Sequence, residues 1–356
     1  MTSLPTLHAT SQCNADILNW RFCTDRVSLI AKVSFVLRPG VVSELTAPAP
    51  IVLRDRHHHD APARSLSATS DLIPFIPGAE VLVVGHAFSP NHAPVQALRV
   101  ALELSGPQGS LVHKELDVLG DRRGPAARPA PFIRMPLVWE RALRTKNNPV
   151  GIEGMFAMPN IVDPTHPNTA AGLGPIARQW PLRRRRLAGA PIPALEDDPL
   201  ELPPALDFGF FFTAPEDQRL ASPLFKPGSP ATRLALANLH PQIPRLELLL
   251  PNVRVVARLS NSADLVLHEV DMVADRLVLD TDQRLGSLVF RALFGALDEV
   301  RRVELGVALG GEAPRFANPS DPSSLRGRKR ATRALPPQQP LRTQRLEEID
   351  DGTPTS

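Results

Sequence analysis

Apolar side chains alternate with polar or small ones over many short stretches of this chain. Every second residue from Val27 to Phe35 is apolar, and Pro39-Gly40 follows as a turn signal. A period of two residues turns one face of an extended segment toward a core and predicts a β-strand. Further segments with this period, or with a short apolar run, are 41–45, 51–53, 79–88, 96–104, 111–118, 233–238, 245–250, 253–259, 264–273, 276–280, 287–293 and 301–309.

The spacing of these segments predicts a mainly β protein with two strand-rich blocks, built as antiparallel sandwich or barrel-like sheets. The chain contains 39 Pro and 21 Gly, which interrupt helical patterns too often for long helices. A Pro-rich irregular region joins the blocks, and a disordered tail follows them. The predicted boundaries are 1–123 for the N-terminal block, 124–230 for the connecting region packed on the sheets, 231–310 for the C-terminal block and 311–356 for the tail. Whether the two blocks form one fold stays open at this point.

Composition and charge argue against several classes of protein. Forty basic residues against 37 acidic ones give a net charge of +3, and the chain has no Tyr, so neither a basic surface nor stacking aromatics favour a nucleic-acid partner. The N-terminus lacks the pattern of a secretory signal, and no apolar run reaches 18 residues. We therefore expect a cytoplasmic protein without a membrane span.

The run His57-His58-His59-Asp60 contains residue types that bind zinc. Neighbouring residues of a strand point to opposite faces, so at most His57 and His59 converge, and further ligands would have to come from elsewhere. A solvated turn is the better interpretation. We expect no metal site and no cofactor.

The sequence contains none of the common motifs of nucleotide-binding proteins, metalloproteases or serine hydrolases. This favours a protein that is not an enzyme. The alternative is a hydrolase-like enzyme acting on a carbohydrate or a peptide, with Asp71, His86 and Glu140 as its polar centre.

Two groups of charged residues in the connecting region have candidate roles. Arg183 to Arg186 lie beside Trp180, and Arg and Trp are enriched at binding hot spots, so a partner contact competes here with a solvated loop. Arg134, Glu140 and Arg141 lie in loop-rich sequence, where we expect a buried ion-pair network that ties the Pro-rich segments to the sheets.

A series of unusual motifs follows in a fixed order along the chain. They are VSLIAKVSFVLRPG at 27–40, SDLIPFIPGAEV at 70–81, VGHA at 84–87, FIRMPL at 132–137, WERA at 139–142, NPVG at 148–151, PNI at 159–161, DP at 163–164, GLGPI at 172–176, RQW at 178–180, Asp207, FF at 210–211 and APEDQ at 214–218. Their order resembles that of a bacterial family with a domain of unknown function, DUF2169. The resemblance covers roughly residues 20–310, and its most specific part is the SDLIPFIPGAEV segment with the VGHA that follows.

The chain departs from the family pattern at three places. Residues 143–146 replace a Gly pair, Ile76 replaces a Lys, and Phe208-Gly209 replace a Pro-Arg pair. These differences put in doubt any role that needs a flexible Gly turn after residue 142.

The resemblance implies a function for the chain and a set of residues that serve it. It implies an accessory protein of a type VI secretion locus, acting as an adaptor or chaperone that binds an effector in the cytosol and assists its loading onto the spike protein. A structural component of the spike is a further alternative, and the expected partner in either case is a protein. The residues to which the resemblance assigns a structural or partner-binding role are Ser70, Asp71, Pro74, Phe75, Gly85, His86, Arg134, Met135, Pro136, Trp139, Glu140, Arg141, Asn148, Pro149, Gly151, Pro159, Asn160, Gly174, Pro175, Trp180, Asp207, Phe211, Pro215, Asp217 and Gln218.

Overall fold

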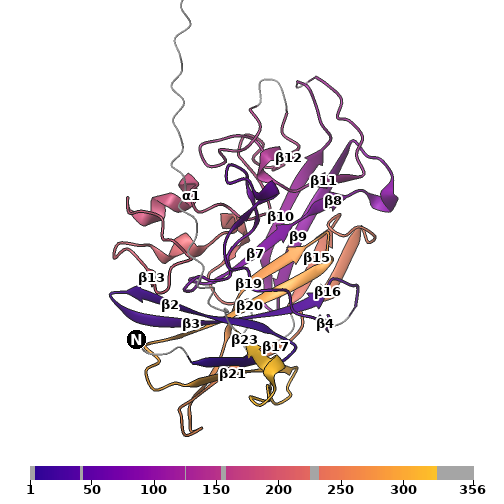
Figure 1. Cartoon of the computed structure of the whole chain (residues 1–356). Coiled ribbons are helices and arrows are strands. Elements are labelled where there is room, and N and C mark those ends of the chain that lie inside the picture. Colours follow the sequence, from indigo (N-terminus) through magenta and orange to yellow (C-terminus); the bar gives the residue numbers. More distant parts are fainter. Residues whose placement is uncertain (1–4, 41–42, 125, 154–157, 225–231, 327–356) are drawn as a thin grey trace, which may run out of the picture.

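The computed structural model describes residues 5–40, 43–124, 126–153, 158–224 and 232–326 (Figure 1). Over these residues the protein is mainly β, and its one α-helix, α1 (Pro181–Arg184), is a single turn. No helix in the described ranges is long and apolar enough to cross a membrane. The prediction of a mainly β protein is confirmed.

An eight-stranded sheet forms the centre of the molecule, in the order β13-β2-β3-β20-β19-β7-β14, with β4 added to β3. Its strands are β2 (Asn14–Phe22), β3 (Thr24–Val36), β4 (Leu45–Thr46), β7 (Ala79–Val84), β13 (Leu200–Glu201), β14 (Arg219–Leu220), β19 (Val273–Asp280) and β20 (Leu285–Phe294). Strand β3 pairs with β20, and β7 lies parallel to β19. The two strand-rich blocks therefore share this sheet and form one fold.

Two further open sheets pack around this centre. The six-stranded sheet has the order β18-β17-β21-β1-β23, with β22 added to β21, and the five-stranded sheet has the order β12-β10-β9-β15-β16. The strands of the first are β1 (Thr6–Ala9), β17 (Val253–Ser260), β18 (Val266–Asp271), β21 (Arg302–Leu309), β22 (Arg315–Phe316) and β23 (Leu325–Arg326). Those of the second are β9 (Ala97–Gly106), β10 (Gly109–Leu119), β12 (Ile161–Val162), β15 (Arg233–Ala237) and β16 (Arg245–Leu249).

Short elements fill the connections between the sheets. Two small sheets pair β8 (His86–Phe88) with β11 (Arg134–Pro136), and β5 (Arg56–His57) with β6 (Leu66–Ala68). The 3-10 turns are η1 (His58–Asp60), η2 (Pro90–His92), η3 (Trp139–Arg141), η4 (Arg185–Leu187), η5 (Phe208–Phe211), η6 (Glu216–Gln218) and η7 (Pro322–Ser324).

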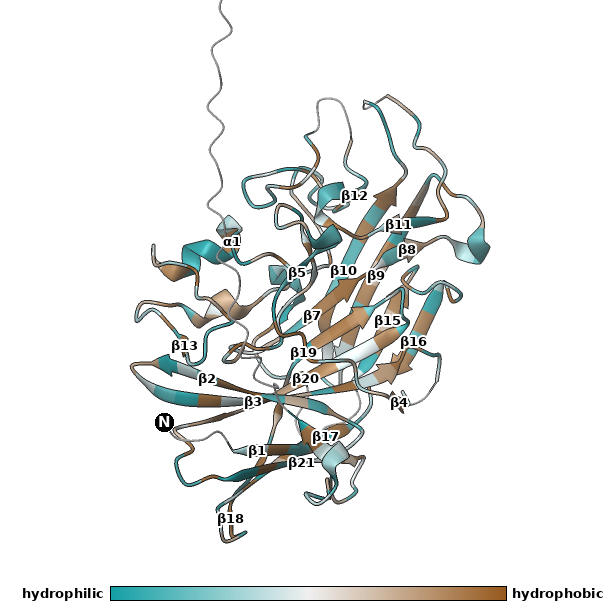
Figure 2. Cartoon of the chain, viewed as in Figure 1, coloured by the Kyte–Doolittle hydropathy of each residue, from teal (hydrophilic) through white to brown (hydrophobic). Residues whose placement is uncertain are grey.

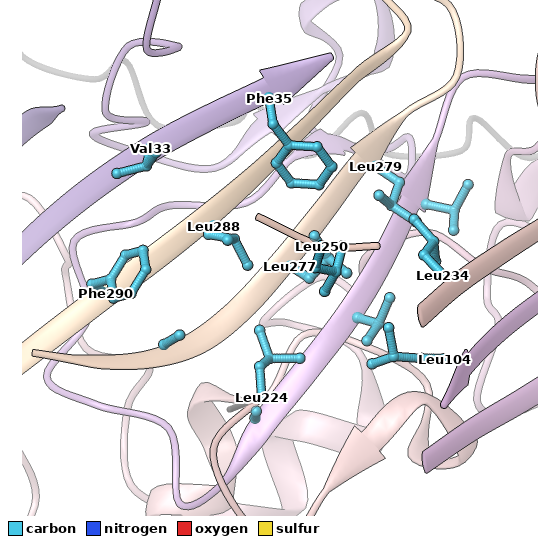
Figure 3. Close-up of a cluster of buried hydrophobic side chains, with 14 of the residues drawn as sticks. Val33, Phe35, Leu104, Leu224, Leu234, Leu250, Leu277, Leu279, Leu288 and Phe290 are labelled. Atoms are coloured by element: carbon cyan, nitrogen blue, oxygen red, sulfur yellow. The ribbon is translucent and has the colours of Figure 1, made fainter. Parts of the chain in front are cut away.

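The main core lies where the sheets face one another. Figure 3 shows Phe35 of β3 and Leu288 of β20 on the eight-stranded sheet, close to Leu234 of β15 and Leu104 of β9 on the five-stranded sheet. A second apolar cluster covers the opposite face of the central sheet with Ile30, Val289 and side chains of the connecting region. Strand β3 is therefore buried on both faces from Val27 to Phe35, where its alternating pattern predicted one buried face.

The polar positions of β3 explain this difference. Ser28, Lys32 and Ser34 point to the second face and are buried there. Each finds a polar partner: the Ser28 hydroxyl donates to the Pro74 carbonyl at 2.6 Å, and the Ser34 hydroxyl lies 3.0 Å from that of Ser287. A buried polar side chain with a partner is tolerated, so a period of two does not require a wet face.

Several predicted boundaries differ from the structure. Residues 51–53 are not part of a strand, and residues 41–42 of another predicted strand lie outside the described ranges. Strand β2 turns into β3 at Cys23, whose φ of 62° makes a tight turn without the Gly or Asn that would have announced it. The described sheets contain three parallel pairs, β1 with β21, β2 with β13 and β7 with β19, beside the predicted antiparallel ones.

The first part of the predicted tail belongs to the fold. Within 311–326, β22 pairs with β21 and β23 pairs with β1. The Ser324 hydroxyl lies 2.8 Å from Nδ1 of His8, and both residues are buried. Backbone pairing and one buried polar contact thus hold a segment that has few apolar residues. The remaining part of the predicted tail, 327–356, lies outside the described residues.

Replacing Gly286 with Ala should destabilise the core. Gly286 of β20 lies opposite Phe35 of β3, and a Cβ at Gly286 would overlap the Phe35 ring. We expect Gly286→Ala to lower the free energy of unfolding by about 1–3 kcal/mol through overpacking, measured by urea denaturation. Gly295→Ala is the matched control, because a Cβ there meets no atom within 4 Å. Equal stability of the two variants would contradict the packing described here.

Candidate functional site

A network of buried ion pairs lies on the second face of the central sheet. Lys32 Nζ of β3 lies 2.8 Å from the Asp71 carboxylate, and Arg276 of β19 lies 2.7 Å from Glu80 of β7 and 3.5 Å from Asp71. Arg291 of β20 pairs with Asp275. All these side chains are almost completely excluded from solvent.

Hydrogen bonds extend the network to the Pro-rich segments. The amides of Thr213 and Ala214 donate to the Glu80 carboxylate at 2.7 and 2.8 Å. Arg276 donates to the carbonyl of Ser70, and Arg291 donates to that of Asp71, each at 2.8 Å. The network therefore fastens two loops, around residues 70–71 and 213–214, to the central sheet.

The pKa values of these groups reflect a balance between burial and pairing. Burial alone would raise the pKa of the Asp71 carboxyl, but Lys32 and Arg276 outweigh it and hold the pKa below its ordinary value. Glu80 behaves in the same way, because burial is outweighed by Arg276 and the two backbone amides. At Asp275 burial dominates over Arg291 and raises the pKa. Asp71 and Glu80 are thus stabilised as carboxylates.

The expected ion-pair network exists, but our prediction of its members was wrong. Arg134 is exposed on β11, and Glu140 binds Ser65 instead of an arginine. Arg141 reaches Asp121 at 2.8 Å, an exposed carboxylate. Apart from Asp71, which lies in the loop before β7, the true members lie on central strands, where a charged side chain interrupts an apolar run. That interruption, as in Lys32 or Glu80, is the sequence signal that could have revealed them.

Six motif residues that do not take part in this network meet in a polar cleft: Gly85, His86, Pro136, Glu140, Arg141 and Asn160. The cleft has a volume of about 770 Å³, within the usual range of ligand pockets. The segments that line it are far apart in the sequence. Its lining residues are His58, His59, Arg64, Ser67, Val84, Gly85, His86, Asp121, Pro136, Val138, Glu140, Arg141, Ile152, Asn160, Asp280, Asp282 and Gln283.

Gly85 brings β8 close to the loop after β19. Gly85 has a φ of 105°, a backbone conformation that residues with a side chain rarely adopt. The Thr281 side chain lies so close to Gly85 that a Cβ there would overlap it. The Thr281 hydroxyl accepts from the His86 amide at 2.8 Å, and His86 Nδ1 lies 2.9 Å from the Asp282 carboxylate. The glycine and histidine of the VGHA motif thus fix one wall of the cleft.

The WERA motif forms the opposite wall through η3. The amide and hydroxyl of Ser65 donate to the two carboxylate oxygens of Glu140 at 2.8 and 2.6 Å. Arg141 donates to Asp121 at 2.8 Å and to Asn160 at 3.0 Å. These contacts hold the two charged side chains in place along the wall.

Three titratable groups of the cleft have shifted pKa values. The hydrogen bond from Arg141 lowers the pKa of Asp121. Burial lowers the pKa of His58, an effect that the nearby Glu140 partly opposes. Burial, together with the neighbouring Asp282, raises the pKa of Asp280. The shifts of His58 and Asp280 favour the neutral forms, so His58 presents an uncharged imidazole to the cleft near pH 7.

The three residues of the hydrolase alternative do not meet at one point. His86 and Glu140 line the cleft, whereas Asp71 lies in the buried network with Lys32 and Arg276. In the described ranges no group of three His, Cys, Asp or Glu side chains is arranged to hold a metal ion. His57 Nδ1 lies 2.6 Å from the Arg64 carbonyl, which leaves His58 and His59 of the histidine run at the cleft.

Other motif residues brace the connecting region. Trp139 Nε1 donates to the Gly174 carbonyl at 3.2 Å, and the Trp139 ring meets that of Trp180 edge-on with centroids 5.8 Å apart. Asn148 Nδ2 donates to the Trp139 carbonyl at 2.9 Å, and Gly151 lies tightly against Asn148. This cluster positions η3 and hence the wall that carries Glu140.

The remaining motif residues are distributed over the core and the surface. Gln218 Nε2 donates to the carbonyls of Val81 and Leu173, and Asp217 pairs with the buried Lys114 at 2.8 Å. Ser70, Pro74, Met135, Pro159, Pro175, Phe211 and Pro215 are buried, and Pro149 is exposed. Most of the motif residues thus have a structural role in this fold.

The arginine run is divided between interior and surface. Arg183 is buried, donates to the carbonyls of Ile176 and Phe210, and lies over the Phe210 ring. Arg186 pairs with Asp207. Arg184 and Arg185 are left for the predicted partner contact.

Phe208, at a position where the chain departs from the family pattern, belongs to an aromatic cluster. Phe208 stacks on Phe75 with centroids 4.5 Å apart and meets Phe22 edge-on at 5.1 Å. Because this position carries an aromatic ring, the second apolar cluster extends out to the surface there.

Comparison with known proteins gives one family. The model of a family described as an uncharacterized protein conserved in bacteria (DUF2169) matches residues 24–291, a range that contains every residue lining the cleft. No curated protein and no solved structure matches the chain.

Glu80→Gln should destabilise the protein strongly. The change leaves Arg276 buried with less compensating charge, which costs about 3–5 kcal/mol in comparable buried pairs. Glu201→Gln is the control, because the exposed Glu201–Arg21 pair should contribute no more than about 1 kcal/mol. The free energy of unfolding in urea measures both. Similar losses in the two variants would show that the network is not a main source of stability.

Stability should fall in acid because of Asp71 and Glu80. Both have folded-state pKa values below their ordinary values of 3.8 and 4.5, so their contribution is present above these values and is lost as pH falls below them. Asp275, with a raised pKa, acts in the opposite direction and reduces the net effect. We expect the urea midpoint of the wild type to drop between about pH 5 and 3, and to drop less in Glu80→Gln. Parallel pH profiles would contradict this assignment.

Proposed function

The chain belongs to the bacterial DUF2169 family, and on this basis we propose that it is an adaptor that binds a type VI secretion effector in the cytosol and assists its loading onto the spike protein. The link to secretion rests on what the family resemblance implies. Binding of a protein partner is supported by the cleft, where four motif segments from distant parts of the chain meet.

The state of the charged groups in the cleft favours binding over catalysis. Glu140, Arg141 and His86 are each held by a neighbouring side chain. Arg64 is exposed, and its guanidinium has no ion pair with any described residue. A rigid polar wall with one unpaired cation suits recognition of an acidic or carbonyl-rich segment of a partner protein.

A hydrolase-like enzyme is the second candidate, and one contact favours it. His86 Nδ1 lies 2.9 Å from Asp282, the arrangement of a general base and the carboxylate that orients it, and Glu140 lines the same cleft. In this version Asp282 takes the role that was predicted for Asp71. The adaptor proposal predicts that His86→Ala changes partner capture, while the enzyme proposal predicts loss of turnover.

The adaptor proposal predicts capture of a specific partner from native cytosol. The tagged full-length chain and the chain ended after Arg326 should both recover an effector or a spike protein, identified by mass spectrometry, because the cleft lies within the described residues. Ending the chain after residue 310 is unsuitable, because it would remove β22 and β23. Recovery of no such protein would contradict the proposal. Detection of the chain itself in secreted fractions would favour a component of the spike.

Charge reversal in the cleft should weaken this capture. We expect Arg64→Glu to reduce the recovered partner by about tenfold or more, because it replaces the unpaired cation of the cleft with an anion. Arg26→Glu is the matched control, since Arg26 is also exposed and lines a separate cavity of about 210 Å³. An equal effect of the two changes would point to net charge and not to the cleft.

A further inference from the structure

The three large sheets end in strands of very different length. The eight-stranded sheet ends in β13 and β14, which have two residues each. Two-residue strands also end the five-stranded sheet at β12 and the six-stranded sheet at β23. Very short edge strands are a common protection against unwanted pairing, because they present few free backbone groups.

The two remaining edges are longer, and one of them is covered. Strand β16 has five residues, and Gly40 forms a parallel bridge to its Leu248. The amide and hydroxyl of Ser43 both donate to the Leu249 carbonyl, at 3.1 and 2.8 Å. The chain after β3 therefore occupies this edge.

Strand β18 is the long edge without such a cover in the described residues. It has six residues, five of them exposed, and pairs with β17 on one side. Apolar side chains are exposed on it and next to it: Leu265 (62%), Val266 (46%), Val270 (37%) and Val273 (44%). Figure 2 shows β18 at the lower end of the molecule and β8, which carries His86 of the cleft, well above it.

The edge is held in a fixed conformation and carries little free charge. The Asn261 side chain accepts from the amides of Ala263 and Leu265 and shapes the turn into β18. Glu269 and Asp271 bind Arg258 and Arg254 of the neighbouring β17 at 3.0 and 2.6 Å. Both carboxylates are thus paired with arginines of β17. The backbone N–H and C=O groups on the other side of β18 have no strand partner in the described residues.

We propose that the free edge of β18 is a docking site that adds an extended apolar segment of the effector as a further β-strand. Backbone N–H and C=O groups that face away from β17 would pair with the added strand. Val266 pairs with Ser260 and Val270 pairs with Ala257, so the two valines lie on opposite faces of the sheet, and each would pack against an apolar side chain of the added strand on its own face. This inference rests on the proposed function. Because β18 lies apart from β8 and its cleft residue His86, one adaptor would hold its cargo by strand addition and keep the cleft for a second contact.

An effector segment fits this edge better than a second copy of the chain. A six-residue edge is about 20 Å long, and pairing of two such edges buries far less than the roughly 800 Å² per partner of a stable dimer. A segment of a larger partner is not limited in this way, because the partner also makes contacts elsewhere. The charges of β18 are paired with arginines and its valines are exposed, so β18 suits an uncharged extended segment of the effector.

The test compares two double variants of the full chain. Val266→Lys/Val270→Lys places charges on the edge, and Leu53→Lys/Leu111→Lys places the same charges on residues that are 46% and 38% exposed elsewhere. We expect the edge variant to recover at least about tenfold less effector from native cytosol than the wild type, and the control to recover the same amount. In the purified complex with that effector, the amides of 266–271 should exchange hydrogen more slowly than in the free chain.

The other outcomes overturn the inference in distinguishable ways. If both variants recover the effector as the wild type does, the edge is not the docking site and the adaptor proposal stands. If the wild type recovers no effector, both proposals fail. If the free wild type is a dimer and the edge variant a monomer, a second copy occupies β18. If ending the chain after Arg326 speeds amide exchange in free β18, the residues beyond Arg326 occupy it.

Discussion

The pairing of Arg276 with Glu80 and Asp71 is the interaction on which the rest of this structure depends. A guanidinium excluded from solvent is tolerable when carboxylates lie within a few ångströms. Arg276 donates from Nε to Glu80 and from Nη1 to the Ser70 carbonyl, while its Nη2 has no hydrogen-bond partner among the described residues. Here the two carboxylates come from β7 and from the loop that precedes it, and Glu80 also receives the amides of Thr213 and Ala214. The network therefore forms only when β7 lies beside β19 and the loops at residues 70–71 and 213–214 reach this face of the sheet. This requirement gives that face a single arrangement.

The sequence predicts the strands well and their partners poorly, for a physical reason. Apolar alternation is local, so segments such as β9, β17 and β21 were found within one or two residues. Pairing is not local: β7 lies beside β19, and β1 lies beside β21. Strand β2 was not predicted as a separate strand, because its turn into β3 at Cys23 uses a positive φ without a turn-forming residue. Short edge strands such as β13 carry no periodic signal at all.

The candidate site was predicted in part for the same reason. The motif series singled out His86, Glu140, Arg141 and Asn160, and all of them line the cleft. Asp280 and Asp282 were missed, because nothing near them in the sequence marks a carboxylate that meets the VGHA motif in space. Asp71 was assigned to the site, but it lies in the core beside Lys32. The assignment failed because the type of a residue does not reveal whether its neighbours will neutralise its charge.

The parallel pairs between the beginning and the end of the chain affect how the protein is made. Val81 of β7 lies opposite Leu277, and Leu7 of β1 lies opposite Val303 and Arg326. A ribosome therefore releases most of the chain before the central sheet can acquire its middle strands. During that interval β3 and β7 lack β20 and β19, so their apolar residues stay open to chaperones and to aggregation. The central sheet is therefore completed late, and a chain that stops before β21 lacks the parallel partner of β1.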